Sequence, residues 1–113
     1  DGGMHHLFSA TGNFGQLIKR NYRIVNVHGS DEGRAEEPHE LVGPLCTPLD
    51  SMGRNVSLPR CRPGDMIVFK NAGAYGLSAS PIHFLKHTLP AEVVHSAGRF
   101  ALTQVASSGE NSE

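Results

Sequence analysis

The stretch at residues 63–69 reads PGDMIVF, in which a Pro-Gly-Asp turn precedes a short continuous apolar run. This combination is typical of a turn that leads into a buried β-strand. Elsewhere in the chain, polar and apolar residues alternate at 23–27, which predicts a β-strand. Residues 39–43 are a second candidate strand. Residues 91–95 and 99–103 surround a Ser-Ala-Gly turn and predict a closing β-hairpin.

Glycine and proline support a β-rich fold. The 13 glycines and 7 prolines are spread along the chain, as is common where many short strands and turns alternate. Helix is expected to be scarce, because residues 15–20 and 50–53 offer at most one or two turns each and neither shows a sustained 3.6-residue period. The residues alone therefore predict a mainly β domain, a barrel or a sandwich, with short helical connections.

Composition restricts the functional classes. The 113 residues, 38% of them hydrophobic, are enough for one compact domain or for a piece of a larger chain. Ten Lys and Arg against eleven Asp and Glu give a net charge of −1, which argues against a nucleic-acid partner and against a polybasic membrane contact. No apolar run approaches the roughly 20 residues that a membrane-spanning helix needs.

The ends of the sequence suggest an excised domain. Asp1 opens the chain without an initiator methionine or a signal peptide, so we expect a fragment of a longer, cytoplasmic protein. Residues 106–113 contain little to bury and are expected to form a disordered tail. Cys46 and Cys61 are expected to be free thiols in the reducing cytoplasm.

Seven histidines raise the possibility of a metal site. His5 and His6 are adjacent, and His83 and His87 are bracketed by prolines, while no paired Cys-x-x-Cys or Glu-x-x-His motif accompanies them. Hydrogen-bonded or solvent-facing histidines explain the pattern better. We therefore predict no metal site.

Cys46 is the strongest candidate for chemistry. It lies in GPLCTPLD (residues 43–50), where two prolines favour a stiff loop outside the strand ladders. A thiol held on such a loop suits proton donation or nucleophilic attack; the alternative is a buried, unreactive cysteine. The glycine-containing turns at residues 12–15 and 73–76 can bring backbone N–H groups to a phosphate, or they are simple turns.

Several motifs occur in a characteristic order: DGGM (1–4), GPLCTPLD (43–50), PGDMIVF (63–69), AGAYG (72–76) and PAEVV (90–94). Together they resemble the C-terminal β-domain of the fold-type III pyridoxal-phosphate decarboxylases, the group of diaminopimelate and ornithine decarboxylase. The resemblance covers roughly residues 1–105. It implies an all-β fold, a small Greek-key-type β-barrel like the C-terminal domain of alanine racemase.

The resemblance also implies pyridoxal 5'-phosphate as cofactor, bound mainly through an N-terminal (β/α)8 barrel that this sequence lacks. Lys19, Lys70 and Lys86 are the only lysines, and none matches the family's cofactor-binding lysine, so the domain alone is expected to be inactive. Tyr75 matches the tyrosine whose hydroxyl reaches the cofactor phosphate. Cys46 matches the cysteine that crosses a dimer interface and returns a proton after CO2 leaves.

Two further positions have implied roles. Asp50 matches an acid near the dimer interface, for which we expect a structural ion pair. Thr47 occupies a substrate and interface position where the diaminopimelate enzymes carry an acid, and the arginine that follows their opening motif is missing until Arg20. These departures argue against free diaminopimelate or ornithine as the substrate.

The sequence GNFGQ (12–16) together with CTPLD (46–50) is similar to a subgroup that includes exosortase A system-associated decarboxylases and an enzyme acting on glutamate tethered to an acyl-carrier protein. The expected partners are the protein's own barrel domain, a second subunit in a homodimer, and an amino-acid substrate that is free or carrier-tethered; neither nucleic acid nor membrane is expected. Two other functional classes are open: a free-standing β-barrel binding module without catalysis, and a histidine-rich metal-binding protein.

Overall fold

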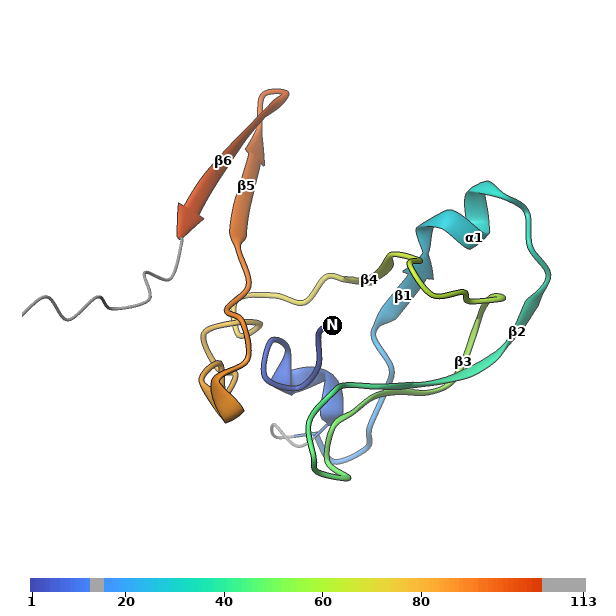
Figure 1. Cartoon of the computed structure of the whole chain (residues 1–113), viewed down its shortest axis with the longest axis horizontal. Helices are drawn as coiled ribbons and strands as arrows, with labels where there is room; N and C mark the ends of the chain where they lie inside the picture. The colour runs from blue at the N-terminus through green and yellow to red at the C-terminus, as the bar shows by residue number, and fades with distance from the viewer. Residues whose placement is uncertain (13–15, 105–113) are drawn as a thin grey trace, which may run out of the picture. The chain divides into compact units, whose positions relative to one another are not determined.

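The computed structural model describes residues 1–12 and 16–104, so the expected tail at 106–113 lies outside the described residues. The chain divides into two units, residues 1–81 and residues 82–113 (Figure 1). The first contains η1 (Phe8–Thr11), β1 (Arg23–Asn26), α1 (Val27–Asp31), β2 (Glu36–Val42), β3 (Ser51–Pro59) and β4 (Ile67–Lys70); the second contains η2 (Phe84–Lys86), β5 (Glu92–Ser96) and β6 (Arg99–Gln104). The mainly β prediction is confirmed.

Strands β1 and β4 pair antiparallel, with Ile24 opposite Phe69 and Val25 opposite Val68. Both strands were predicted from their sequence pattern, but β4 is less buried than expected. Its first three residues are only half-buried, and the preceding Met66 is 58% exposed. The physical reason is that this part of the chain borders an open cavity rather than a closed core.

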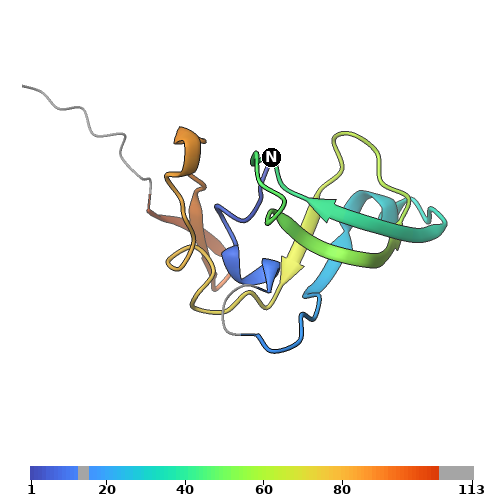
Figure 2. The same cartoon turned by 90° about the horizontal axis from the view of Figure 1, so that it is seen from below.

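Strands β2 and β3 form the longer antiparallel pair and curve side by side in two perpendicular views (Figures 1 and 2). The predicted helical turn at 50–53 is wrong, because Ser51 begins β3. Sequence patterns miss this strand since it is interrupted: Gly53 lies opposite Leu41 at a register shift, and Asn55 has a positive φ of 48°. Pairing with β2 keeps the segment extended despite its weak local preference.

The other helix predictions also need correction. Residues 16–20 are not helical, and the rest of the predicted segment at 15–20 lies outside the described residues. A short helix that the sequence patterns did not indicate, α1, forms directly after β1. Its cause is Asn26, whose side-chain oxygen accepts the Gly29 N–H at 3.0 Å and caps the first turn.

The buried interior of residues 1–81 mixes apolar and polar side chains. Six apolar and five polar residues are buried: Met4, Ala10, Ile24, Leu45, Met52 and Leu58, with His5, Ser9, Thr11, Asn26 and Asp50. A core of this size depends on its polar residues finding partners, because a buried polar group without a hydrogen bond is destabilising.

Asn26 and Asp65 form one such polar centre. The Asn26 amide donates to Asp65 Oδ2 at 2.9 Å, and Arg34 donates to both Asp65 oxygens at 2.6 and 3.2 Å. The Arg62 backbone N–H adds a bond of 2.8 Å. The Arg34 guanidinium first, and then Asn26, hold the pKa of Asp65 well below its usual range. This centre ties the turn before β4 to the start of α1.

The depressed pKa of Asp65 predicts a dependence of stability on pH. Because the carboxyl has a lower pKa in the folded than in the unfolded chain, its contribution is complete above about pH 4 and is lost as the pH falls toward the folded-state pKa. Urea denaturation at about pH 6 and about pH 3 should show that Asp65→Asn lowers stability more at the higher pH than at the lower one, where part of the contribution is already lost. Asp31→Asn, at an exposed acid, is the control. Equal effects of the two substitutions at both pH values would contradict the prediction.

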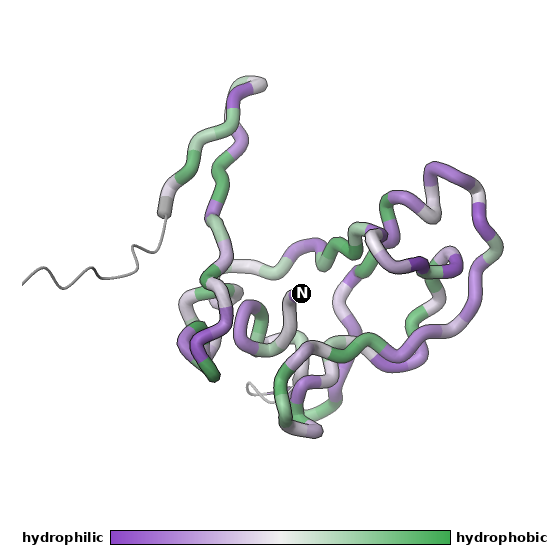
Figure 3. The backbone as a smooth tube through the Cα atoms, viewed as in Figure 1, coloured by the Kyte–Doolittle hydropathy of each residue, from purple (hydrophilic) through white to green (hydrophobic). Residues whose placement is uncertain are grey.

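In the second unit, β5 and β6 form the predicted hairpin. Val93 lies opposite Leu102, and the His95 ring stacks on Phe100 with centroids 4.5 Å apart. Both strands carry consecutive hydrophobic residues, Val93 and Val94 in β5 and residues 100–102 in β6, and the hydropathy colouring follows them along the hairpin (Figure 3). Val93, Phe100 and Leu102 are nevertheless exposed. An isolated two-stranded hairpin is only marginally stable, so this apolar face needs cover. Sheet pairing among the described residues consists of three two-stranded sheets.

Candidate functional site

Cys46 lies on the loop between β2 and β3, as predicted, and its side chain is exposed. This exposure contradicts the alternative of a buried cysteine. The ends of the loop are joined by the Gly43 N–H, which donates to the Asp50 carbonyl at 3.0 Å. The thiol therefore lies on a loop whose two ends are hydrogen-bonded to each other.

The buried carboxylate of Asp50 holds this loop in place. Its carboxylate is almost completely buried, with the residue 3% exposed, and accepts the Leu45 N–H at 2.9 Å and the Met4 N–H at 2.7 Å. A Cβ on Gly43 would overlap the carboxylate, and a Cβ on Gly3 would lie 2.7 Å from Oδ2. Gly3 of the DGGM motif and Gly43 of the GPLCTPLD motif are therefore both needed, because the Asp50 carboxylate packs directly against their backbone.

The expected ion pair of Asp50 is replaced by hydrogen bonds to the backbone. Among the ion pairs of the described residues none involves Asp50, and its two oxygens receive N–H groups instead. Backbone donors satisfy a buried carboxylate without requiring a second buried charge. A role of Asp50 at a subunit interface stays a prediction.

Thr47 is half-buried, and its side chain bonds to the backbone of the same loop. Its hydroxyl oxygen accepts the Leu49 N–H at 3.2 Å, and its carbonyl accepts the Asp50 N–H at 3.2 Å. Bonds of this kind between a threonine and the backbone two residues later stabilise a local turn. In this conformation Thr47 stiffens the segment that follows Cys46.

Tyr75 lies in the turn after β4 and is 67% exposed. Gly73 has a φ of 74°, which lets the chain turn there, and Ser80 closes the region by donating its hydroxyl to the Gly76 carbonyl at 2.6 Å. The same Ser80 oxygen accepts the Phe8 N–H at 2.8 Å. The tyrosine is thus displayed on a loop fastened to the start of η1.

The N-terminal segment connects the two candidate loops. Met4 is bound by Asp50 from the Cys46 loop, and Phe8, four residues later, is bound by Ser80 from the Tyr75 loop. The turn between them is closed by the His6 N–H, which donates to the Gly3 carbonyl at 2.9 Å. A single short segment therefore positions both loops.

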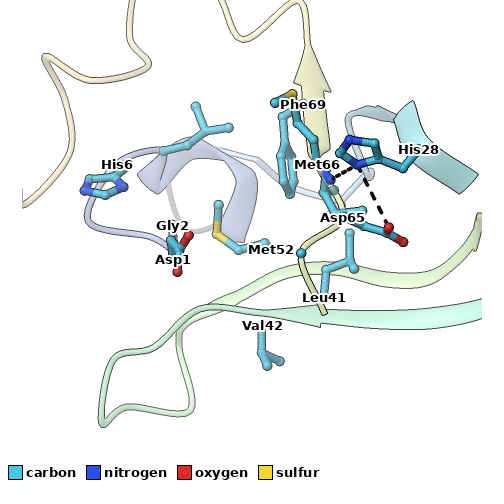
Figure 4. Close-up of a pocket in the computed structure, with 14 residues that line it drawn as sticks. Asp1, Gly2, His6, His28, Leu41, Val42, Met52, Asp65, Met66 and Phe69 are labelled. Atoms are coloured by element: carbon cyan, nitrogen blue, oxygen red, sulfur yellow. Dashed lines mark hydrogen bonds and ion pairs between the residues drawn. The ribbon is translucent and has the colours of Figure 1, made fainter. Parts of the chain in front are cut away.

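A separate cavity of 560 Å³ opens between the N-terminal segment, β2 and β4 (Figure 4). Its walls are mainly apolar, with Met52 and Phe69 inside. At the rim, His28 Nδ1 accepts the Met66 N–H at 3.0 Å and lies 3.9 Å from Asp65 Oδ1. None of Cys46, Thr47, Asp50 and Tyr75 is among the lining residues, and neither is any lysine or arginine. Among the described residues, a phosphate group therefore finds no lysine or arginine in this cavity to bind it.

Sequence reasoning missed this cavity and the polar centre beside it. The PGD turn marked Asp65 only as a turn residue, and nothing local indicated that Arg34, 31 positions earlier, would bind it. Asn26 had a usable signal, since asparagine is one of the residues preferred at a helix N-cap.

The histidines do not gather as ligands. His5 is 1% exposed, and its ring lies against that of His6 with centroids 3.8 Å apart. Within residues 1–12 and 16–104, no three His, Cys, Asp or Glu side chains are arranged to hold a metal ion. None of the helices in this same part of the chain has the length and apolar character of a membrane span.

Comparison with known proteins identifies relatives of this chain. The model of the pyridoxal-dependent decarboxylase C-terminal sheet domain matches residues 1–73. L-glutamyl-[BtrI acyl-carrier protein] decarboxylase of Niallia circulans is 43% identical over 104 residues, which cover 90% of this chain and 24% of that protein. The 2-[(L-alanin-3-ylcarbamoyl)methyl]-2-hydroxybutanedioate decarboxylase of Staphylococcus aureus is 54% identical over 50 residues, covering 44% of this chain and 12% of that protein.

A solved structure shares the fold. Diaminopimelate decarboxylase from M. jannaschii, in complex with L-lysine, superimposes with a TM-score of 0.71 at 24% sequence identity, over 90% of this chain and 21% of that one. The chain thus spans about a quarter or less of the relatives that it matches.

Proposed function

Because this chain belongs to the pyridoxal-dependent decarboxylases, as their C-terminal sheet domain, we propose that it completes the active site of a dimeric amino-acid decarboxylase. The observation that carries the proposal is the shared anchoring of the Cys46 and Tyr75 loops on residues 3–8. Catalysis needs groups held to within about 1 Å, and a common anchor provides such placement.

The residues present fit one wall of a cofactor site. Tyr75 offers an exposed phenol beside a glycine turn. Its hydroxyl would donate a hydrogen bond to the phosphate of the cofactor. Cys46 offers an exposed thiol that holds a proton for the substrate carbon from which CO2 departs. When bound, pyridoxal phosphate supplies the electron sink that decarboxylation requires.

The main cofactor contacts are proposed to lie outside this chain. Lys19 donates its ammonium to the Ser51 carbonyl at 2.8 Å and is thereby occupied. Lys70 is exposed at the end of β4, and Lys86 is exposed in the second unit. The lysine that carries the cofactor, and most of the phosphate contacts, are assigned to an N-terminal (β/α)8 barrel, so that residues 1–113 are inactive alone.

The finer architecture follows from the same proposal. The domain is assigned the small Greek-key-type β-barrel of this family. The active protein is a cytoplasmic homodimer in which the Cys46 loop reaches the partner's active site.

The proposed substrate is an amino acid attached to a carrier protein. Thr47 brings no negative charge, so this position does not offer the distal ammonium of a free diamino acid an ion pair. The Niallia circulans relative is named for a glutamyl group on an acyl-carrier protein. A tethered glutamyl group is therefore the first substrate to assay.

The test is CO2 release by the full-length protein with pyridoxal phosphate and glutamyl-carrier protein. Release that needs both components supports the proposal. A folded, cofactor-loaded protein that releases no CO2 from tethered or free amino acids would favour the alternative, a binding module without catalysis.

Tyr75→Phe should weaken cofactor binding in the full-length protein. Loss of one hydrogen bond to a charged phosphate costs about 1.5–3 kcal/mol, which raises the dissociation constant about tenfold or more. Titration of the apoprotein with pyridoxal phosphate, followed by absorbance, measures this change. Tyr22→Phe is the matched control, because the Tyr22 hydroxyl bonds to Ser9 at 2.7 Å within the domain. Equal affinities of wild type and Tyr75→Phe would contradict the role of Tyr75.

A further inference from the structure

Apart from Lys19, the lysines and arginines of residues 1–81 fall into two groups. Arg34, Arg60 and Arg62 all form ion pairs with acids. Arg20, Arg23, Arg54 and Lys70 are exposed, and among the described residues none of them has an ion pair. The near-neutral net charge of the chain conceals this separation.

Backbone contacts bring the second group together. Arg23 and Lys70 are direct partners across β1 and β4. The Asn21 amide donates to the Arg54 carbonyl at 2.6 Å, and the Arg54 N–H donates back to Asn21 at 3.0 Å. These bonds hold the segment before β1 against the middle of β3.

Two large apolar side chains lie three and two positions before Arg20 in the chain. Leu17 and Ile18 are among the most exposed hydrophobic residues in the chain. We call Leu17, Ile18, Arg20, Arg23, Arg54 and Lys70 the basic–apolar surface. Exposed aliphatic side chains bordered by unpaired positive charges are a common composition of protein docking sites.

Lys19 anchors this surface to the base of the Cys46 loop. Its ammonium donates to the carbonyl of Ser51, the residue that follows Asp50. Its aliphatic part lies so close to Gly12 that a Cβ there would be 2.8 Å from Lys19 Cγ. Burial and then the nearby charge of Arg54 lower the pKa of Lys19, while Glu40 acts in the opposite direction. The surface is therefore attached to the loop that carries the candidate thiol.

We propose that the basic–apolar surface docks an acidic carrier protein that presents the tethered amino acid to the active site. This inference rests on the proposed function and names its partner. The positive charges attract an acidic protein surface, and Leu17 and Ile18 supply the apolar contact that charge alone does not provide. Charge complementarity distinguishes this occupant from a neutral partner.

The test compares two substrates of the full-length holoenzyme: glutamyl-carrier protein and a small glutamyl-pantetheine thioester. In Arg20→Glu/Arg23→Glu and in Leu17→Ser/Ile18→Ser, KM for the carrier-bound substrate should rise about tenfold or more at low salt, because the attractive or apolar contact is lost. The kinetics with the small thioester should be unchanged. Added salt should raise the wild-type KM for the carrier substrate and should change the charge-reversed variant less.

Arg60→Glu is the matched control, since it reverses one exposed charge at the end of β3, where Arg60 faces Glu37 at 3.3 Å. It should leave KM for the carrier substrate near the wild-type value. Equal losses with both substrates would overturn the proposal by placing these residues in the substrate pocket. No loss with either substrate would overturn it as well.

Direct binding separates failure of docking from failure of the proposed function. Fluorescence anisotropy of a labelled carrier protein without its substrate measures docking even if no CO2 is released. Saturable binding that Arg20→Glu/Arg23→Glu weakens supports the surface. Absence of binding by the wild type, or binding only to vesicles of anionic lipid, overturns it.

Discussion

Cys46→Ala in the full-length protein should lower kcat by about 10²–10⁴-fold while the affinity for pyridoxal phosphate stays near that of the wild type. A positioned general acid typically contributes this factor, and the exposed thiol is the group that this chain offers for returning a proton. Steady-state CO2 release and cofactor titration measure the two quantities. Cys61→Ala is the matched control, because Cys61 accepts a bond from Asn26 at 3.5 Å and lies outside the Cys46 loop.

Mixed dimers test whether Cys46 acts on the partner's active site. Chains with Cys46→Ala are combined with chains that lack the cofactor-binding lysine, so that one site of each mixed dimer retains both groups. Activity should return in proportion to the mixed dimers formed. Mixed dimers without any activity would refute the action of Cys46 across the interface.

Asp50→Ala should destabilise the domain by about 2–5 kcal/mol, since the N–H groups of Met4 and Leu45 each lose a charged acceptor in a buried place. Chemical denaturation measures the loss. Asp31→Ala removes an exposed acid of α1 and should change stability little. If the two alanine variants are equally stable, Asp50 does not hold the loop.

The variant Asp50→Asn tests whether Asp50 positions the Cys46 loop for catalysis or only stabilises the fold. The amide keeps one acceptor oxygen but turns an NH2 group toward a backbone N–H, so one of the two anchors weakens. In the full-length protein at a temperature where the variant is folded, kcat should fall while the cofactor affinity stays near that of wild type. An unchanged kcat would show that anchoring of the Cys46 loop is not limiting.

The amino-acid sequence by itself determined the features that depend on local patterns. Strands β1 and β4 and the β5–β6 hairpin follow from alternation, apolar runs and turn residues that act over a few positions. The loop at 43–50 follows from two prolines that cannot take part fully in a ladder. The ordered motifs also identified the family, which the match to residues 1–73 confirms.

Only the tertiary structure decided the features that depend on distant partners. Strand β3 is extended because β2 pairs with it, although residues 50–53 resemble a turn of helix. Asp50 was expected in an ion pair, yet its oxygens receive the N–H of Leu45, five residues away, and of Met4, 46 residues away. A local pattern contains no information about which buried donors a carboxylate will meet, because that depends on how the N-terminal segment folds over the loop. The attachment of Lys19 to Ser51, which gathers the basic–apolar surface beside the same loop, has the same physical origin.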